Sequence, residues 1–433
     1  MKKGLLLLIF SLFAFRSATF AQSGLTRGCA INALYSGDST NMEFPGSTEF
    51  ERWLKRAQEM EEEKAVTDDN ELYYIPVVIH ILHFGEEIGV ERNLSASRIQ
   101  SQLDILNNDF GRLPGTPGFN TNPAGADTRI RFCLAAVDPN GQPTSGIVRV
   151  QGTKPSYDFL GDNALIKNSS IWNPDKYLNI WTCKIAGDQY IGYAQYPFIT
   201  DSISMPLPIP DVLPDGVVID YRVFGDVPAG SSGPFTAYNK GRTVTHEVGH
   251  YLGLIHIWGD GLSCTDNATD YCTDTPPQAS YTSGCPASVS SCTSGVPAMF
   301  QNYMDYTNDA CMNVYTNDQK RRMRIVMRNA PRRKTLFTVP TQCGISSVAD
   351  PEKSTAWIQL YPNPALDVLN LDGVVGVSGT VKIIRSDGRV FSAPTTIQND
   401  KIQVNVSNLK SGIYWIEQAG QNGKIARGKF VKF

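Results

Sequence analysis

The sequence predicts an α/β domain followed by a small all-β sandwich, and three observations support this. Apolar strand-like runs alternate with helix-like segments as far as residue 256. Residues 257–345 are rich in Asp, Thr, Ser, Pro and Gly, as loops are. Residues 357–433 form short alternating runs separated by turn signals, among them Asp387-Gly388. A chain of 433 residues is long enough for two or three such domains.

The N-terminus has the layout of a secretory signal peptide. Two lysines precede an apolar run from Gly4 to Phe15, and small residues then lead to Ala21 and Gln22. The alternative, a membrane anchor, needs a longer apolar run, and no later run approaches the roughly eighteen residues of a membrane span. We therefore expect residues 1–21 to be removed on export, and we expect no membrane span.

Composition and cysteine content narrow the class of protein. The net charge of -3 gives no support to nucleic-acid binding, which requires a basic face. All nine cysteines lie beyond the predicted signal peptide, and an exported chain meets an oxidising compartment. Because nine is odd, at least one thiol has no intrachain disulfide partner.

The elements of the first domain follow in order. After a polar segment, residues 50–65 have the charge and pattern of a helix, and 95–110 place apolar residues at helical spacing. Strands are predicted at residues 73–84, 129–137 and 177–185, with a weaker candidate at 216–225. His80 and His83 lie three apart on the first strand and point to opposite faces, so we interpret both as structural. The long irregular stretch at 257–345 needs disulfides or bound ions to hold it.

Residues 246–256 read HEVGHYLGLIH and contain three of the five histidines of the chain. On a helix, His246 and His250 lie one turn apart on one face and can bind one metal ion. His256 cannot join them if the helix continues, because it would lie about 15 Å further along the axis. Gly253 is placed to end the helix and turn the chain back.

Three neutral nitrogen donors with an open fourth position are the pattern of a catalytic zinc site. Zinc lowers the pKa of a bound water, and Glu247 can take its proton and pass it to a leaving amine. The chemistry that this pattern implies is amide hydrolysis. Two surface histidines on a helix are common, but the full H-E-x-x-H-x-x-G-x-x-H spacing is a much rarer coincidence.

This motif resembles that of the metzincin metalloproteases. The segment QNYMDYTNDACMN, together with DTPPQ at 274–278 and GCP at 284–286, is similar to the pappalysin family in particular. The resemblance covers residues 70–343 and implies a mixed twisted sheet, an active-site helix and a loop-rich lower subdomain. It also implies that Met304 forms the methionine turn beneath the metal.

The resemblance implies further roles. Tyr306 matches a tyrosine that steadies the transition-state oxyanion, and Asp309 matches an acidic residue in the pocket for the side chain after the scissile bond. A carboxylate there favours Arg or Lys by charge pairing, although a solvated turn residue is the alternative. Cys29, in the sequence RGC, resembles a cysteine switch that fills the fourth zinc position in a latent form. The alternative is that Cys29 forms a disulfide, with Cys343 for example.

Disulfides and calcium follow from the same resemblance. Family spacing suggests the pairs Cys264–Cys292 and Cys285–Cys311, and Cys133–Cys183 is a third candidate because each lies on a predicted strand. Cys272 and Cys343 are left over. Pappalysin-like enzymes bind calcium near the loop at residues 264–276, and carboxylates suit that ion. The candidate ligands are Asp266, Asp270 and Asp274, although aspartates in turns and caps are an equal alternative.

The C-terminal sandwich alone fits substrate binding, adhesion or a sorting signal. The segments LYPNP at 360–364, LKSGIY at 409–414 and the terminal KFVKF resemble sorting domains of cargo for the type IX secretion system of Bacteroidota. The resemblance implies export across both membranes of a Gram-negative bacterium to the surface or the medium. The secretion machinery would then be a partner.

The resulting prediction is a secreted zinc endopeptidase acting on proteins or peptides and made as a latent zymogen. Arg52, Lys55 and Arg56 are each candidates for the end of the propeptide. An adhesion protein with a structural zinc site is the competing class, although Glu247 argues against it, and a zinc hydrolase of other substrates is a third. The expected segments are 1–21 signal peptide, 22–50 propeptide, 51–345 catalytic domain, 346–356 linker and 357–433 sorting domain.

Overall fold

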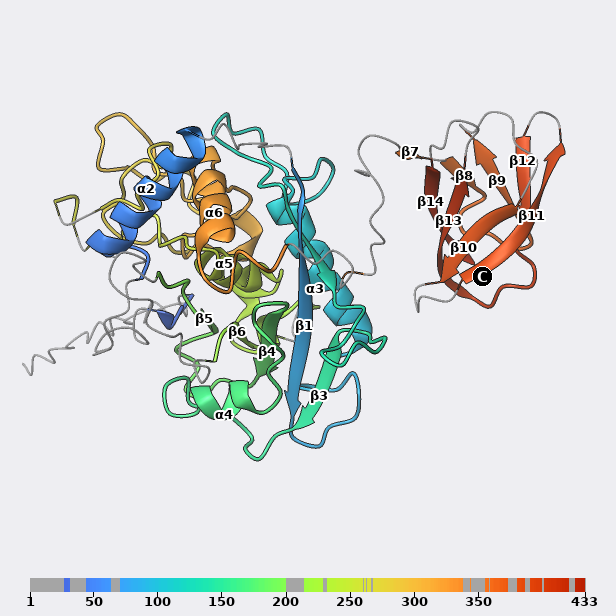
Figure 1. Cartoon of the computed structure of the whole chain (residues 1–433), viewed down its shortest axis with the longest axis horizontal. Coiled ribbons are helices and arrows are strands. Elements are labelled where there is room, and N and C mark those ends of the chain that lie inside the picture. Colours follow the sequence, from blue (N-terminus) through green and yellow to red (C-terminus); the bar gives the residue numbers. More distant parts are fainter. Residues whose placement is uncertain are drawn as a thin grey trace, which may run out of the picture. The chain divides into compact units, whose positions relative to one another are not determined.

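The computed structural model describes the chain in two compact units, residues 1–344 and 345–433 (Figure 1). The described residues are 27–31, 44–63, 71–199, 214–228, 232–259, 261, 263–265, 268–337, 343, 355–357, 359–372, 380–385, 390–398, 401–419 and 425–432. The predicted signal peptide lies outside them. No helix among these residues is both long and apolar enough to cross a membrane.

A mixed sheet forms the centre of the first unit. Its strands are β1 (Tyr73–His83), β2 (Ile130–Leu134), β3 (Ile147–Gln151), β4 (Leu178–Cys183), β5 (Gly192–Ala194) and β6 (Val217–Asp220). The order is β2-β1-β4-β6-β5, and β3 pairs with β1 further along the edge that β2 occupies. All pairs are parallel except β5 with β6, so the sheet ends in an antiparallel edge strand. The mixed sheet expected from the resemblance is confirmed.

Strand β1 is central because it is apolar along nearly its whole length. Nine of its eleven residues are buried, so both of its faces are covered. It also pairs with a neighbouring strand on each of its two edges. Helix α3 (Ala96–Phe110) packs beside the sheet through Ile99, Leu103 and Leu106. Its first turn is capped by the Ser95 side chain, which accepts from the backbone N–H of Arg98. The sequence had placed strand β1 and helix α3 correctly.

Two helices near the ends of this unit are joined by buried ion pairs. Helix α2 (Thr48–Glu63) packs against α6 (Asn317–Asn329), where Phe50 meets Val326. The Arg322 guanidinium donates two hydrogen bonds of 2.6 Å to the Glu51 carboxylate, and its Nε donates to the carbonyl of Gly253 at 2.7 Å. Helix α2 therefore supports, through one arginine, the turn that precedes His256.

The stretch that the sequence predicted as loop contains one regular helix. Helix α6 begins at a capping box in which the Thr316 side chain accepts from the Gln319 backbone and the Gln319 side chain accepts from the Thr316 backbone. The prediction of loop as far as residue 345 is therefore wrong for residues 317–329. Between α5 (Arg242–Tyr251) and α6 the described chain is otherwise irregular apart from one 3-10 turn, η3 (Asp309–Cys311). The remaining short elements of the unit are α4 (Asn163–Asn168), η1 (Tyr221–Val223) and η2 (Thr236–Tyr238).

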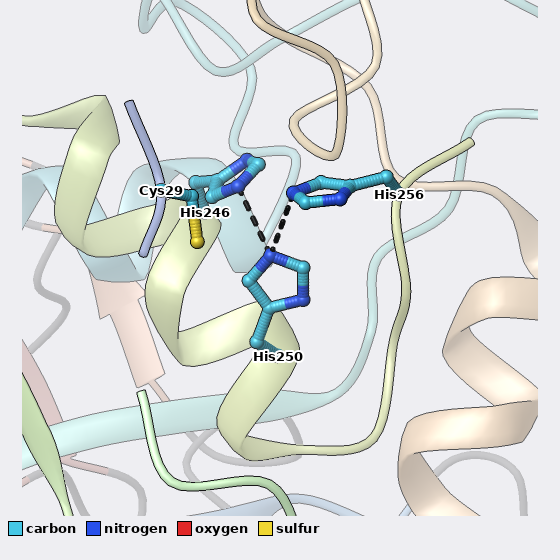
Figure 2. A group of neighbouring side chains, drawn as sticks. All are labelled: Cys29, His246, His250 and His256. Carbon is cyan, nitrogen blue, oxygen red and sulfur yellow. Dashed lines mark hydrogen bonds between the residues drawn. The ribbon is translucent and has the colours of Figure 1, made fainter. Parts of the chain in front are cut away.

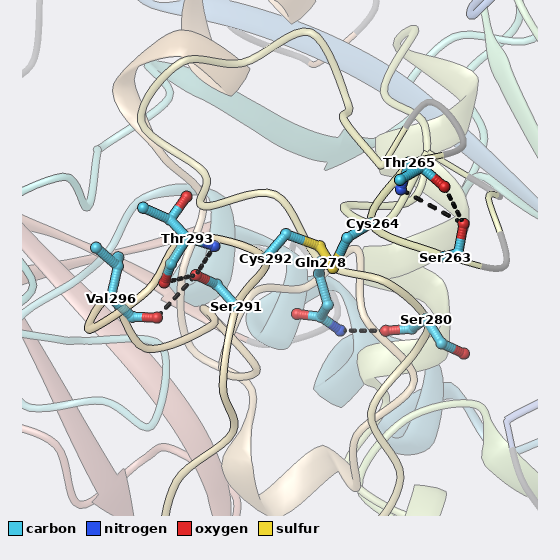
Figure 3. Close-up of a disulfide and its surroundings, with 9 residues drawn as sticks. All are labelled: Ser263, Cys264, Thr265, Gln278, Ser280, Ser291, Cys292, Thr293 and Val296. Carbon is cyan, nitrogen blue, oxygen red and sulfur yellow. Dashed lines mark hydrogen bonds between the residues drawn. A yellow bond between two sulfur atoms is a disulfide. The ribbon is translucent and has the colours of Figure 1, made fainter.

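Disulfides hold this irregular stretch together. The structure pairs Cys264 with Cys292 (Figure 3) and Cys285 with Cys311. These are the two pairs implied by the resemblance. The candidate pair Cys133–Cys183 is wrong, because Cys133 is bonded to Cys343, 210 residues away. Cys183 is instead enclosed in a core with Trp181 and Tyr193, and it takes part in no disulfide. Cys29 and Cys272 are not disulfide-bonded either.

The second unit is all β. Its strands are β7 (Thr355–Trp357), β8 (Gln359–Tyr361), β9 (Val368–Asp372), β10 (Thr380–Arg385), β11 (Val390–Gln398), β12 (Lys401–Asn405), β13 (Gly412–Ala419) and β14 (Ile425–Lys432). They form one sheet in the order β7-β14-β13-β10-β11-β12-β9-β8, and a bridge from Ala365 to Lys432 brings its ends together. A core including Leu369, Ile383 and Ile416 fills the inside. This arrangement agrees with the predicted small sandwich.

Candidate active site and metal centre

Helix α5 carries the first two histidines and is buried along its whole length. It packs against strands β5 and β6 on one side and against α3 on another. His246 and His250 project from one face, as the four-residue spacing predicts, and their Nε2 atoms are 3.1 Å apart (Figure 2).

A glycine turn returns the chain to the same point. The N–H of Gly253 donates to the carbonyl of His250 at 2.9 Å, and the N–H of Leu254 donates to that of Gly249 at 3.0 Å. These two bonds, with φ of +97° at Gly253, make a Schellman motif. The turn delivers His256, whose Nε2 lies 3.1 Å from that of His250 (Figure 2).

Hydrogen bonds on the far side of two rings fix where their protons lie. Nδ1 of His246 lies 2.7 Å from the carbonyl of Tyr303, and Nδ1 of His250 lies 2.9 Å from the carbonyl of Leu254. A carbonyl only accepts, so each Nδ1 carries the proton and each Nε2 presents a lone pair. Lone pairs that face one another at 3.1 Å repel unless a cation lies among them. The donor set therefore fits a zinc ion.

Burial keeps the ring of His246 neutral. The pKa of His246 is well below its usual value because burial disfavours the charged ring, and positive charge on His250 and His256 would add to this. His256 stacks on Trp258 with ring centroids 4.3 Å apart, which fixes the plane of the third ring. Neutral imidazoles are the form that binds a metal.

A short N-terminal segment supplies a fourth donor. Cys29 pairs in parallel with Gly192 of β5, where Ala30 donates to the carbonyl of Gly192 at 3.1 Å and Ile191 donates to that of Gly28 at 2.9 Å. The Cys29 thiol and the three histidines form the one group of three or more His, Cys, Asp and Glu ligand atoms that the described residues bring together. All of these ligand atoms lie within 4.8 Å of one another.

Glu247 lies beside this group. Its Oε2 accepts from the Cys29 thiol at 3.3 Å. Burial raises the pKa of Glu247 to about 8, while the bond from Cys29 and the charge of Arg27 act in the opposite direction. A Cβ at position 192 would lie 3.0 Å from Cγ of Glu247, so glycine in β5 leaves room for this side chain.

The segment that follows the disulfide-rich loop brings Met304 and Tyr306 to the site. Met304 is fully buried, and a Cβ at Gly249 would lie 2.5 Å from its sulfur, so Met304 packs directly against the helix between the two histidines. The ring of Tyr306 lies 5.0 Å from that of His256 and 5.7 Å from that of His246. Both residues therefore lie next to the histidine-bearing part of the chain.

Asp309 is fully buried, and the side chain of Arg27 from the N-terminal segment pairs with it. The guanidinium of Arg27 pairs with Oδ1 of Asp309, donates to Oγ1 of Thr243 at 3.3 Å and lies 4.9 Å above the ring of Tyr238. Its Nη2 also lies 3.5 Å from the carbonyl of Thr307. Asp309 is thus no solvated turn residue.

Of the calcium candidates, only Asp270 and Asp274 lie among the described residues, and these two are not gathered with other ligand atoms into a group. Asp266 lies outside the described residues. Asp270 is buried and accepts from the N–H of Cys272 and from the side chains of Thr275 and Gln319, and burial raises its pKa to about 7. Asp274 accepts from the N–H of Asp318, and its other oxygen is buried without a hydrogen-bond partner among the described residues.

The structure adds site residues that the sequence analysis had not singled out. Arg27 contacts Asp309, Thr243 and Tyr238, and the ring of Trp258 stacks on that of His256. The available signal for Arg27 was its position two residues before Cys29.

Sequence comparison places the chain among secreted proteases. The family model for pregnancy-associated plasma protein-A, a peptidase family, matches residues 232–328. An extracellular metalloprotease of Neurospora crassa is 41% identical over 272 residues, which cover 62% of this chain and 82% of that protein. Another from Arthroderma otae is 31% identical over 249 residues, covering 58% of this chain and 76% of that protein.

Solved structures agree with this placement. Mature mirolysin of Tannerella forsythia, in complex with a cleaved peptide, is 37% identical and matches with a TM-score of 0.54 over 64% of this chain and 99% of its own. A promirolysin variant from the same organism is 34% identical and has a TM-score of 0.55 over 68% of this chain and 94% of its own.

The second unit has its own relatives. A model for the secretion system C-terminal sorting domain matches residues 359–432, which confirms the sorting domain expected from the LYPNP and LKSGIY segments. This domain indicates type IX secretion and an extracellular or surface location. The extracellular relatives support the same location. With its three-histidine centre, metzincin fold and sorting domain, the chain belongs to the pappalysin family and is an extracellular zinc metalloendopeptidase.

Proposed function

We propose that this enzyme cleaves peptide bonds on the amino side of arginine or lysine and is made as a latent zymogen. One observation carries the proposal, namely that Arg27 of the N-terminal segment fills the Asp309 pocket while Cys29 lies among the zinc-binding histidines. The segment thus offers the pocket the kind of side chain that a substrate would offer.

The lining of the pocket favours a cation, and an arginine above all. A guanidinium can pair with Asp309, donate to the oxygens of Thr243 and Thr307 and stack on an aromatic ring at once, as Arg27 does against Tyr238. A lysine has one compact ammonium group and can satisfy fewer of these partners. We therefore expect arginine to be preferred to lysine after the scissile bond.

Latency follows from the fourth donor. The thiol of Cys29 occupies the position that a water must take for hydrolysis, and its bond to Glu247 also engages the carboxylate that would act on that water. The Gly28 position fits this arrangement, because a Cβ there would lie 1.9 Å from the carbonyl oxygen of Gln189. Glycine therefore lets the segment approach β5 closely.

Removal of the segment leaves a site suited to amide hydrolysis. A zinc ion bound by His246, His250 and His256 would supply an acidified water and a Lewis acid for the scissile carbonyl. Glu247 would accept the proton of the water and deliver it to the leaving amine. The Tyr306 hydroxyl would donate to the developing oxyanion, and Met304 would support the site from below.

We assign residues 22–50 to the propeptide and 51–345 to the catalytic domain, with 346–356 as linker and 357–433 as sorting domain. The predicted border at residue 51 falls inside helix α2, so the helix contributes to both segments as assigned. The oxygen of Asp274 that has no hydrogen-bond partner among the described residues supports a calcium site that includes Asp274 and Asp270. The third predicted ligand, Asp266, lies outside the described residues. Protein or peptide substrates and the type IX machinery are the proposed partners.

The test is cleavage of a denatured protein by the activated full chain, with fragment ends identified by mass spectrometry. We expect cuts before Arg and, less often, before Lys. Glu247→Ala should abolish them while zinc content and thermal stability are retained. Cuts before other residues would disprove the Asp309 pocket assignment but leave the endopeptidase intact.

Latency has a separate test. Cys29→Ala should make the unprocessed chain active at once, whereas the native chain should gain activity only after the segment is removed. Cys272→Ala is a matched control, because that thiol is also buried and free of disulfides but is absent from the ligand group. Equal activity of native and Cys29→Ala zymogens would disprove the role of Cys29.

A further inference from the structure

Arg242, the first residue of helix α5, lies between two buried aspartates. Its Nη1 donates to the backbone carbonyl of Asp309 at 3.1 Å, and its backbone N–H donates to Oδ2 of the same residue at 3.2 Å. On its other side, Nη2 pairs with Oδ1 of Asp109 on α3 at 3.3 Å. A second positive charge therefore lies beside the carboxylate that forms the bottom of the pocket.

The charges of this region balance when the pocket is filled. Arg27 and Arg242 carry two positive charges, and Asp109 and Asp309 carry two negative ones. The exposed fractions are 1% for Arg27, 5% for Arg242, 2% for Asp109 and 0% for Asp309, so water screens these charges little. When the guanidinium of Arg27 leaves, the three that remain have one net negative charge, which is available to a cationic substrate side chain.

The balance depends on Asp109. Without its charge, Arg242 would offset Asp309, and the pocket would have no net attraction for a cation. We propose that Asp109, although it lies outside the pocket, is a specificity-determining residue that neutralises Arg242 and so leaves the charge of Asp309 to the substrate. This inference rests on the proposed preference for arginine after the scissile bond.

Other contacts of Asp109 define the structural alternative. Its Oδ2 accepts from Oγ1 of Thr245 at 2.8 Å, one residue before His246. Asp109 could therefore act only by fixing the start of helix α5, in which case its loss would affect all substrates equally. The experiment must separate this effect from the effect of charge.

Two peptides that differ in one residue make the separation. One has arginine after the scissile bond and the other has citrulline, which has nearly the same shape without the charge. For the activated full chain we expect kcat/KM to be higher for arginine. Asp109→Asn, which keeps an oxygen facing Thr245, should lower the arginine-to-citrulline ratio by about tenfold and leave citrulline cleavage nearly unchanged.

A second variant tests whether charge is the cause. Arg242→Gln removes the cation and should raise the ratio, and the double variant Asp109→Asn/Arg242→Gln should restore it toward the native value. Asp215→Asn is the matched control, because Asp215 is equally buried and pairs with Arg333 away from the pocket. It should leave the ratio unchanged whatever it does to stability.

The outcomes are distinct. A native ratio near one would overturn the proposed preference and this inference with it. A high native ratio that Asp109→Asn leaves intact, or a loss that is equal for both peptides, would overturn only the inference. If Asp109→Asn does not fold, the predicted rise in Arg242→Gln still decides the question.

Hydrogen exchange gives a readout that needs no turnover. In the Glu247→Ala zymogen, the Ala30 N–H is held by the carbonyl of Gly192. Asp109→Asn should speed its exchange, because Arg27 then faces a region with excess positive charge. Unchanged exchange at Ala30 would contradict the charge balance.

Discussion

The two halves of the catalytic unit hold their parts of the site by different means. Up to Tyr251 the chain is built of strands and helices, and α5 presents His246 and His250 through ordinary helical spacing. The following segment, residues 252–316, contains one 3-10 turn among its described residues yet supplies His256, Met304, Tyr306 and Asp309. In this segment, disulfides and tight glycine turns fix the backbone, as the hydrogen bonds of strands and helices do in the first half.

The difference implies different sensitivities. A sheet distributes its stability over many hydrogen bonds and apolar contacts, so a single small change affects one of many. An irregular segment depends on a few disulfides and tight turns. The loss of one of them should displace the site residues that it positions. The first two predictions below compare matched changes in the two halves, and the next two concern contacts of residues in the first half.

The largest effect is expected from the disulfide that joins residues 28 apart, Cys264–Cys292 (Figure 3). Its replacement by serines should lower the free energy of unfolding of the catalytic unit by about 3–4 kcal/mol, because the unfolded chain regains loop entropy. Denaturant titration followed by tryptophan fluorescence measures this. Cys183→Ala in the sheet half should cost much less, and equal losses would refute the comparison.

Gly253→Ala should come next. The residue has φ of +97°, and an added Cβ would lie 2.8 Å from Cγ2 of Val326. We expect a loss of about 1–3 kcal/mol and faster zinc loss to a chelator, since His256 follows the turn. Gly187→Ala is the control, because φ is +83° there but nothing lies within 4 Å of its Cβ. The idea fails if the two variants lose zinc at the same rate.

Gly249→Ala should lower the free energy of unfolding by a smaller amount, whereas the same change in most helices raises it. Alanine inside a helix normally stabilises by about 1 kcal/mol relative to glycine. Here the new Cβ would lie 2.5 Å from the sulfur of Met304 and 3.0 Å from the hydroxyl of Tyr315, so a net loss of about 1 kcal/mol is expected. In a Met304→Ala background the same change should become neutral or stabilising, and thermal unfolding of the four proteins would show it.

The smallest effect concerns pH. Burial raises the pKa of Asp109 to about 6, against the opposing charge of Arg242 and the hydrogen bond from Thr245, with Tyr303 and Asp309 as the other titratable groups that face it. As pH falls through this value, Asp109 gains a proton and Arg242 loses its counter-charge. The arginine-to-citrulline ratio should therefore fall a few-fold between about pH 8 and pH 5.

Taking a ratio removes any titration that affects both peptides alike, such as that of Glu247. In Asp109→Asn the ratio should stay low and independent of pH over the same range. A native ratio that does not change with pH would mean that Asp109 keeps its charge state throughout.

The sequence allowed much of the first half to be predicted, because its signals are local. The HEVGH spacing places two histidines on one helical face, and the apolar run at β1 identifies the central strand. Strands β3 and β5 were not predicted, because no residue of β3 is buried and β5 has only three residues. Helix α6 was missed although its Thr316–Gln319 capping box is a local signal.

What the sequence could not supply was long-range pairing. Cys133 bonds to a cysteine 210 residues away, and no local feature separates that partner from Cys183. Arg27 meets Asp309 across 282 residues, and this contact exists only because β5 binds the N-terminal segment in one register. Such contacts depend on the whole fold, so the chemistry of each residue is predictable but its partner is not.

The ion pair between Glu51 and Arg322 bears on how far maturation trims the chain. Arg52, Lys55 and Arg56 are the candidate ends of the propeptide, and under the proposed specificity a cut before any of them removes Glu51. The guanidinium of Arg322, 4% exposed, would then be a stranded cation next to the turn that carries His256. An N-terminus that retains Glu51 keeps this ion pair. The first residue of the mature enzyme therefore determines how rigidly the turn before the zinc ligand His256 is held.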